Sequence, residues 1–377
     1  MRILFLTPGC FDKGGISRYS RYQIEALREI CGADNVRALS LLGPDENSLE
    51  TPFSVLAHGP ANRHASIMSR LQFATRALYE ALTWRPDVVW SAHVNFTPLL
   101  NLAGRLAGAR TLLNVYGLEI WSGLTAPRRR AMARVHRVLA DCHFTARHVR
   151  DEGLHHSLPT VVWDPVDLRT FAPGPADPAV AARYGLPDPD RHTVVMSLGR
   201  LARAAAHKGF DRLIATVARL APAHPDLRLV IAGRGDDRPR LEALAAEHGI
   251  ADRVIFTGPV DEADLPAIYR AADVFSLVSD RGHGRGEGIP LTPLEAMACG
   301  APIIVGDEDG SQEAVVAGRN GFVVSPRDPG SHAEALGRLA RDPSLRARMG
   351  GEARKVAEEF FSYGRFVSEH RALLGSL

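Results

Sequence analysis

The chain has 377 residues, of which 45% are hydrophobic and 23% are charged, and its formal net charge at pH 7 is +2. This length suits two globular domains, and the charge is too balanced to predict nucleic acid as a partner. No apolar run approaches the length of a membrane-spanning helix, and the four cysteines form no C-x-x-C motif. We therefore expect a cytoplasmic protein without structural disulfides or a zinc site.

The first half of the chain alternates apolar runs with amphipathic segments. Runs typical of buried parallel strands occupy residues 2–7, 87–91, 111–115 and 137–140. A helical periodicity extends from Gly15 to Ile30. Gly14 and Gly15 open this helix, where glycine lets a ligand approach the backbone amides of the first turn.

A proline-rich stretch separates the two halves. Residues 165–189 contain six prolines and few apolar pairs, which is typical of a linker. We therefore predict a first domain over residues 1–168, a linker over 169–190 and a second domain over 191–361.

The second half contains a longer series of the same strand and helix units. Strands are predicted at residues 193–198, 228–232, 253–256, 273–277 and 302–305, separated by helices at about 209–220, 238–247, 263–271 and 293–299. Alternating units of this kind form parallel sheets with helices on both faces. The fold class is therefore α/β, with two Rossmann-like, doubly wound domains and a cleft between them. Ligands of such sheets bind beyond the carboxyl ends of the strands.

Two glutamates eight positions apart mark the most informative segment. Glu287 lies in a glycine-rich loop, and Glu295 lies in the first turn of an apolar helix. Carboxylates accept hydrogen bonds from hydroxyls, and helix N-termini favour anionic oxygens, so the segment suits a ligand with both groups. Thr292 and Glu295 equally fit a capping box, in which Thr292 is the N-cap and Glu295 bonds back to it.

Two cations accompany the first strand of the second domain. Arg200 follows the strand at 193–198, and Lys208 precedes the next helix, with Gly199 and Gly209 beside them. A planar guanidinium and a flexible ammonium together can stabilise the charge that develops on a leaving diphosphate. Ordinary surface cations are the alternative interpretation.

These segments, in this order, resemble family 4 of the retaining, nucleotide-sugar-dependent glycosyltransferases, which have the GT-B fold. The matching segments are Lys13 to Gly15, Ser197 to Leu201, Lys208-Gly209, Ala232 to Gly235, Val254 to Gly258, Glu287 to Gly300 and Asp309 to Glu313. The resemblance covers nearly the whole chain and is closer in the C-terminal half. It also implies that a C-terminal helix, residues 362–377, crosses back onto the first domain.

The resemblance implies a role for each matching residue. Arg200 and Lys208 would neutralise the diphosphate, Glu287 would bond hydroxyls of the donor sugar, and Glu295 would accept from the ribose. Donor contacts would also come from Gly14, Gly15, Gly199, Gly233, Gly258, Gly288 and Ile289. No metal and no cofactor are implied, since the nucleoside-diphosphate sugar is a co-substrate. We interpret Asp236, Asp237 and the acids 307–309 as loop residues rather than metal ligands.

One position departs from the family pattern. Tyr116 stands where many members have a histidine that contacts the donor sugar. Tyrosine can form a similar hydrogen bond but does not titrate near neutral pH. His93, after the strand at 87–91, is a candidate replacement, although a lone histidine is more often structural. We include both among the candidate catalytic residues.

The sequence thus predicts a metal-independent hexosyltransferase (EC 2.4) that acts in polysaccharide, glycolipid or glycoside biosynthesis. Its acceptor would be the hydroxyl of a carbohydrate, a lipid-linked sugar or a small molecule. The alternatives are a hydrolysing epimerase of the same fold, a glycosidase and a catalytically idle sugar-nucleotide-binding protein. The basic stretch from Arg128 to Arg137 predicts either a solvated helix face or a weak peripheral contact with the inner face of a membrane.

Overall fold

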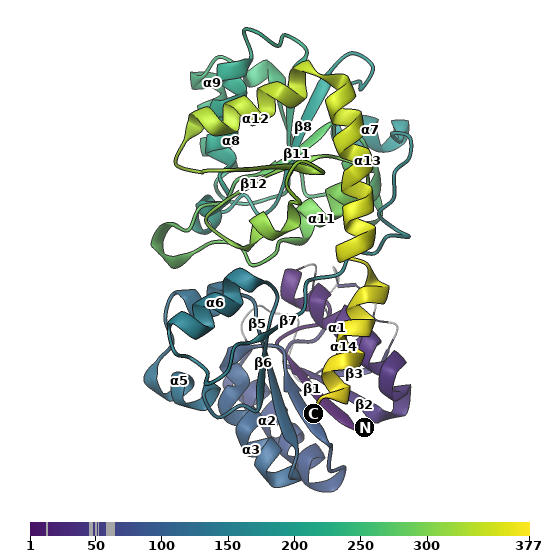
Figure 1. Cartoon of the computed structure of the whole chain (residues 1–377), viewed down its shortest axis with the longest axis vertical. Helices are drawn as coiled ribbons and strands as arrows, with labels where there is room; N and C mark the ends of the chain where they lie inside the picture. Colours follow the sequence, from purple (N-terminus) through teal and green to yellow (C-terminus); the bar gives the residue numbers. More distant parts are fainter. Residues whose placement is uncertain (13, 45–47, 50, 52, 58–64) are drawn as a thin grey trace. The chain divides into compact units, whose positions relative to one another are not determined.

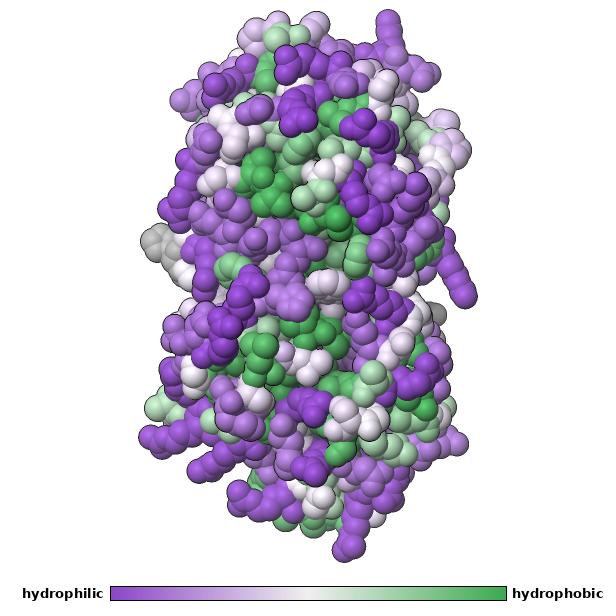
Figure 2. Space-filling model, viewed as in Figure 1, coloured by the Kyte–Doolittle hydropathy of each residue, from purple (hydrophilic) through white to green (hydrophobic). Residues whose placement is uncertain are grey.

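The computed structural model describes residues 1–12, 14–44, 48–49, 51, 53–57 and 65–377, so Lys13 lies outside the described residues. The chain divides into two compact units, Met1–Pro165 together with Tyr363–Leu377, and Val166–Ser362. Each unit is built on a parallel β-sheet (Figure 1). On the face shown in Figure 2, most surface residues of each unit are hydrophilic, and smaller groups of hydrophobic residues lie among these hydrophilic residues. No helix in the described part is long and apolar enough to cross a bilayer.

The described part of the first unit contains a seven-stranded sheet in the order β3-β2-β1-β4-β5-β6-β7. Its strands are β1 (Ile3–Thr7), β2 (Val36–Ser40), β3 (Val55–Ala57), β4 (Val88–Ser91), β5 (Arg110–Val115), β6 (Arg137–Ala140) and β7 (Thr160–Val161). Ile3 pairs with both Val36 and Val88, which places β1 inside the sheet. The four predicted strands correspond to β1, β4, β5 and β6. We did not predict β2, which carries an exposed arginine, or the short strands β3 and β7.

The helices of the first unit cover both faces of this sheet. They are α1 (Gly15–Cys31), α2 (Ile67–Thr83), α3 (Thr97–Ala107), α4 (Leu118–Trp121), α5 (Ala126–Met132), α6 (His143–Asp151) and α14 (Tyr363–Gly375), with short turns η1 (Ala33–Asn35) and η2 (Val94–Phe96). Because side chains alternate along a strand, Leu4 and Leu6 pack into the core beneath α2 and α3. Ile3 and Phe5 pack into the opposite core, beneath α1 and α14. The C-terminal helix α14 therefore belongs to the first unit.

A buried polar network joins the helices α1 and α14 to the sheet. Asn114 Oδ1 accepts from Trp90 Nε1 at 2.8 Å, and Asn114 Nδ2 donates to Gln23 Oε1 at 2.6 Å and to Tyr116 Oη at 3.0 Å. His370 Nδ1 bonds a backbone carbonyl of α14, so its Nε2 accepts from Gln23 Nε2 at 2.8 Å. Paired polar groups of this kind fix side-chain positions in a core. Tyr116 is consequently anchored through Asn114.

The described part of the second unit contains a six-stranded parallel sheet in the order β10-β9-β8-β11-β12-β13. Its strands are β8 (Thr193–Leu198), β9 (Leu227–Ala232), β10 (Val254–Gly258), β11 (Val274–Leu277), β12 (Ile303–Gly306) and β13 (Gly321–Val324). The five predicted strands correspond to β8 through β12. We did not predict β13, an edge strand that is only partly buried.

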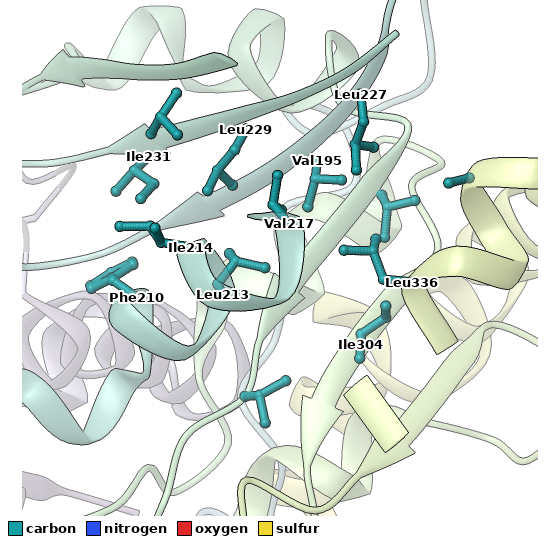
Figure 3. Close-up of a cluster of buried hydrophobic side chains, with 14 of the residues drawn as sticks. Val195, Phe210, Leu213, Ile214, Val217, Leu227, Leu229, Ile231, Ile304 and Leu336 are labelled. Carbon is teal, nitrogen blue, oxygen red and sulfur yellow. The ribbon is translucent and has the colours of Figure 1, made fainter. Parts of the chain in front are cut away.

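Helices cover the second sheet in the same way. They are α7 (Pro178–Tyr184), α8 (Phe210–Leu220), α9 (Arg238–Glu247), α10 (Leu265–Arg270), α11 (Leu291–Ala298), α12 (Pro329–Arg341) and α13 (Pro343–Phe360), with turns η3 (Arg203–Lys208), η4 (Ala251–Arg253), η5 (Glu262–Asp264), η6 (Gly282–Gly284) and η7 (Gly310–Ala314). Figure 3 shows Leu213 and Val217 of α8 facing Val195 and Leu229 of the sheet. Burying each such side chain contributes about 1.5–3 kcal/mol. This packing fixes α8, whose first turn follows Lys208.

The linker predicted over residues 169–190 belongs to the second unit instead. Pro178 starts α7, where its missing amide hydrogen is not needed. Asp264 then accepts from Arg183 Nη1 at 2.6 Å and from Tyr184 Oη at 2.8 Å. Pro178 therefore marks a helix start within the second unit, and the unit boundaries lie at 165/166 and 362/363.

Candidate functional site

The predicted donor-binding segments gather at one edge of the second sheet. Gly199 and Arg200 follow β8, Gly233 follows β9, Gly258 ends β10, and the loop containing Glu287 follows β11. All of these strands are parallel, so their carboxyl ends meet at the same edge. This edge is where ligands of doubly wound sheets bind.

Glu287 is the centre of a charged cluster. Its Oε1 atom accepts from Lys208 Nζ at 2.5 Å and from His207 Nε2 at 3.0 Å. Burial alone would raise the pKa of Glu287, but the Lys208 charge and the hydrogen bonds from His207 and Lys208 outweigh burial and hold it at about 2. Glu287 is therefore an ionised hydrogen-bond acceptor at neutral pH.

His207 is a site residue that the sequence analysis missed. It is 8% exposed, and because the Glu287 carboxylate can only accept, His207 must donate through Nε2. Among the described residues no partner bonds the buried Nδ1 atom, so a bound ligand or water would satisfy it. The one available signal is its position directly before Lys208.

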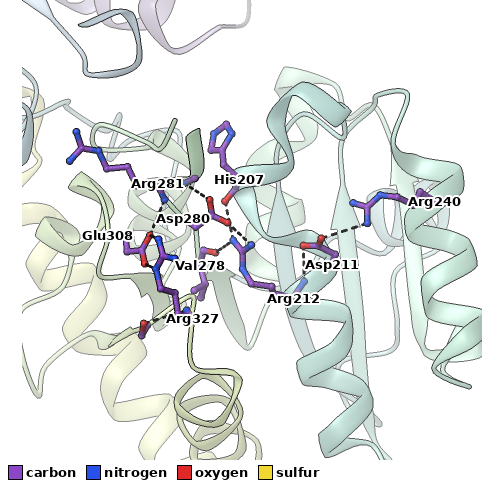
Figure 4. A network of polar contacts seen from close by, with 11 residues as sticks. His207, Asp211, Arg212, Arg240, Val278, Asp280, Arg281, Glu308 and Arg327 are labelled. Atoms are coloured by element: carbon purple, nitrogen blue, oxygen red, sulfur yellow. Dashed lines mark hydrogen bonds and ion pairs between the residues drawn. The ribbon is translucent and has the colours of Figure 1, made fainter. Parts of the chain in front are cut away.

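A single guanidinium group joins the loops that carry Lys208 and Glu287. Arg212 of α8 donates to Asp280 Oδ2 at 2.6 Å, to the Val278 carbonyl at 2.9 Å and to the His207 carbonyl at 3.1 Å (Figure 4). Gly209 has a φ of 76°, and a Cβ atom there would lie 2.5 Å from the Val278 carbonyl oxygen. Only glycine adopts this conformation readily and fits this contact. The loop after β8 is thus held against the loop after β11.

Asp309 lies in the loop after β12, as predicted, but it is buried and bonded to the backbone of Glu287. It is 0% exposed, its Oδ2 accepts from the Glu287 amide at 2.9 Å, and its Oδ1 accepts from the amide and hydroxyl of Ser311. The Gly310 amide donates in turn to the Glu287 carbonyl at 3.0 Å. Burial raises the pKa of Asp309 to about 7, although the bonds from Ser311 and Glu287 oppose this. Asp309 therefore positions the backbone of Glu287.

The Asp309→Asn variant is expected to lower the free energy of unfolding by about 1–3 kcal/mol, because its single carbonyl oxygen cannot serve the amides of both Glu287 and Ser311. Its pKa of about 7 lies above the ordinary 3.8, so the native state holds the proton more tightly than the unfolded state. The contribution of Asp309 to wild-type stability should then be full below pH 3.8 and fall as pH rises toward 7.

Urea titrations across that pH range measure the free energy of unfolding of Asp309→Asn and of the wild type, and how each depends on pH. The variant should lack this part of the pH dependence. Asp307→Asn, an exposed neighbour, is the control and should behave as the wild type. Equal stability of Asp309→Asn and wild type at pH 5 would contradict the positioning role.

The helix start predicted with Thr292 as N-cap is wrong, and the alternative capping box with Glu295 does not form. Helix α11 starts at Leu291 with Pro290 as N-cap, two residues before the predicted start, and no side chain caps it. Glu295 is 2% exposed, and its Oε2 accepts from Tyr269 Oη at 2.7 Å. The earlier start moves Thr292 into the first turn, where it cannot act as the N-cap. The contact of Glu295 with a ribose stays a prediction.

The glycines at the sheet edge differ in whether the packing of the loops accounts for them. A Cβ atom at Gly233 would overlap the carbonyl oxygen of Gly199, and the Gly233 amide already donates to Gly258 at 2.9 Å. Gly233 is thus required by the packing of two loops. In the described part of the chain no group accepts from the amide of Gly288. Donor contacts by these glycines and by Ile289 stay predictions.

Arg200 differs from Lys208 in its surroundings. Its side chain is exposed, and within the described residues it has no hydrogen bond or ion pair. A free guanidinium at a strand end can bind two oxygens of one phosphate. Its position is therefore compatible with the predicted role.

In the first unit, Gly14 is the N-cap of α1 and Gly15 its first residue, as predicted. A Cβ atom at Gly15 would meet nothing within 4 Å, so the space beside this helix start is open. Their contact with a donor stays a prediction.

His93 and Tyr116 are both uncharged at neutral pH. His93 Nδ1 accepts from the Asn95 amide at 3.1 Å and caps η2, while burial and the nearby Arg128 lower its pKa to about 4. Burial raises the pKa of Tyr116 well above 10. Each can therefore donate a hydrogen bond, but neither titrates near pH 7.

Among the described residues, no three His, Cys, Asp or Glu side chains gather into a possible metal site. That the reaction needs no metal stays a prediction.

Comparison with known proteins gives the family. The model of the family described as glycosyl transferases group 1 matches residues 185–356. The chain is also 30% identical over 364 residues to the GDP-mannose-dependent monoacylated alpha-(1-6)-phosphatidylinositol monomannoside mannosyltransferase of Corynebacterium glutamicum, with 93% of this chain and 91% of that enzyme covered. The chain belongs to this glycosyltransferase family. The resemblance found in the sequence is confirmed.

Two further similar proteins are also glycosyltransferases. A GDP-mannose-dependent alpha-(1-6)-phosphatidylinositol monomannoside mannosyltransferase of Mycolicibacterium smegmatis is 33% identical over 279 residues, 72% of each chain. A D-inositol 3-phosphate glycosyltransferase of Salinispora tropica is 36% identical over 233 residues, which cover 57% of this chain but only 47% of that enzyme.

Solved structures confirm the predicted GT-B fold. HepE of Anabaena in complex with UDP has a TM-score of 0.80 at 18% identity, with 100% of both chains covered. Sucrose-phosphate synthase of Thermosynechococcus elongatus has a TM-score of 0.80 at 21% identity, again with 100% of both chains covered.

Proposed function

We propose that this glycosyltransferase moves a hexose from a nucleoside-diphosphate sugar to a hydroxyl of an acceptor that contains phosphoinositol. The donor would bind the second unit as a co-substrate, and the acceptor would bind the first. The names of the relatives support this substrate class, since they include GDP-mannose, phosphatidylinositol monomannoside and D-inositol 3-phosphate. The observation that carries the proposal is the Lys208–Glu287 contact at the edge of the second sheet.

The cluster has the chemistry that sugar transfer needs. Breaking the bond between sugar and diphosphate leaves negative charge on the phosphates, and preorganised cations lower the free energy of that state. The flexible Lys208 side chain can turn from Glu287 to a phosphate oxygen, and Arg200 supplies a second cation. Glu287 keeps its hydrogen bond from His207 and stays ionised, so it can accept from a hydroxyl of the donor sugar.

We further propose retention of the anomeric configuration and a reaction without a metal ion. A departing phosphate oxygen would take the acceptor proton on the same face of the sugar, so no protein base is needed. This choice is supported by His93, whose pKa of about 4 makes it a weak base, and by Tyr116, whose raised pKa keeps it protonated. A cytoplasmic location is also part of the proposal, and the absence of a disulfide at any of the four described cysteines supports it.

Product analysis tests the proposed function. The protein is incubated with GDP-mannose or UDP-glucose, together with phosphatidylinositol monomannoside or inositol 3-phosphate. We expect acceptor-dependent release of the nucleoside diphosphate, an α-linked product by NMR, and no effect of EDTA.

Acceptor-independent turnover would favour a hydrolysing epimerase, and nucleotide binding without turnover would favour an idle binder. Hydrolysis of a sugar chain without nucleotide would favour a glycosidase.

A further inference from the structure

Helices α2 and α3 carry an unusual concentration of exposed apolar side chains. Seven large hydrophobic residues on these two helices are more than 40% exposed: Ile67, Met68, Leu71, Tyr79, Leu82, Leu102 and Leu106. On α2, Met68, Leu71, Tyr79 and Leu82 follow one another at helical spacing along one stripe. α3 lies directly against α2, so the exposed apolar residues lie on two adjacent helices.

The exposed charged residues of α2, α3 and α5 are all arginines. α5 lies against α3, where Asn101 Nδ2 donates to the Ala131 carbonyl at 2.8 Å. The exposed cations of the three helices are Arg70, Arg105, Arg128, Arg129 and Arg130. Within these helices, all of which the structure describes, the one carboxylate is Glu80. Its side chain is 1% exposed and is paired with Arg37 and Arg76.

We propose that the exposed faces of α2, α3 and α5 form a docking surface for an anionic lipid bilayer. Apolar side chains of an interfacial helix enter the boundary between headgroups and acyl chains, and arginines beside them bind lipid phosphates. Tyrosine is also favoured at this depth of a membrane. This surface lies entirely within the first unit and does not depend on which sugar or acceptor the enzyme uses.

A second copy of the chain fits this surface less well. A two-fold contact would bring the same patch of each copy together, so Arg128, Arg129 and Arg130 would face their own like charges. The apolar stripe could also be covered by a partner protein, but that partner would have to place acidic groups opposite the arginines. An anionic bilayer satisfies both the apolar and the cationic groups.

Sedimentation with vesicles tests the docking surface. The full chain is mixed with vesicles of phosphatidylcholine, with and without phosphatidylglycerol, at increasing NaCl concentration. We expect binding to the vesicles that contain phosphatidylglycerol and a loss of binding as salt rises. Leu71→Asp combined with Tyr79→Asp should lower the partition coefficient at least about tenfold. Arg128→Gln and Arg130→Gln should each lower it about fivefold.

The control places the same charge on an exposed apolar residue of the other unit. Val323→Asp, on the edge strand β13, should bind vesicles as the wild type does. Equal binding to both kinds of vesicle, or none, would overturn the proposal. So would a concentration-dependent dimer, measured by sedimentation velocity, that Leu71→Asp with Tyr79→Asp abolishes. Unchanged thermal unfolding shows that a variant is folded, and the arginine variants test the surface independently.

Discussion

Replacing Glu287 with glutamine is expected to lower kcat/KM for sugar transfer about 10- to 100-fold. A hydrogen bond to a charged group contributes about 1.5–3 kcal/mol, and glutamine removes the charge that accepts from the donor sugar in the proposed reaction. It also leaves Lys208, whose side chain is 13% exposed, without its counter-charge. The measurement is acceptor-dependent release of the nucleoside diphosphate under the conditions of the product analysis.

Glu359→Gln is the matched control for Glu287→Gln. Glu359 lies in the same unit, is paired with Arg319 at 3.0 Å and has a side chain that is 52% exposed. Surface ion pairs contribute little, so this variant should retain wild-type activity and stability. If Glu287→Gln retained wild-type kcat/KM while Asp309→Asn lost activity, the loop backbone rather than the carboxylate would carry the function.

The second large effect is expected for Lys208→Ala, which should abolish the rise in melting temperature that a nucleoside diphosphate causes. A ligand at a hundred times its dissociation constant stabilises a protein by about 2.7 kcal/mol. Lys208 is the cation that contacts Glu287, and the proposed reaction moves it onto the phosphates. Thermal unfolding is followed with UDP, GDP, ADP and dTDP, and with their common sugars.

The chain offers a close control for this experiment. Lys355 lies on α13, its side chain is 66% exposed, and it is paired with Glu352 at 2.7 Å. Lys355→Ala should respond to nucleotide as the wild type does. A shift of equal size in Lys208→Ala and wild type would remove Lys208 from the phosphate site. If no nucleotide shifts the wild type, the proposed donor-binding role of the second unit is undercut.

The positions of the central strands of the second unit could be predicted from local patterns. The buried strands β8, β9 and β11 are apolar runs on the central positions of a parallel sheet, where both faces are covered. Such runs are visible without knowing their neighbours. The strands β3 and β13 have partly exposed residues and lie at sheet edges, so their sequences carry a weaker apolar signal.

The site residues also divide into those that the sequence predicted and those that only the structure revealed. Arg200, Lys208 and Glu287 could be named from the sequence because each stands beside glycine in a segment between a predicted strand and the next predicted helix. His207 and Arg212 could not, because their roles depend on partners 80 and 68 residues away, Glu287 and Asp280. No periodicity or spacing rule relates positions so far apart.

By itself, then, the amino-acid sequence determined the two α/β units, the family and the loops that carry the candidate site. These features depend on the order of apolar runs, glycines and charges along the chain. The tertiary structure alone decided that Asp309 supports the Glu287 backbone and that Gln23 meets His370, 347 residues later. The burial of a polar side chain, and the identity of the group that satisfies it, arise only when distant segments pack together.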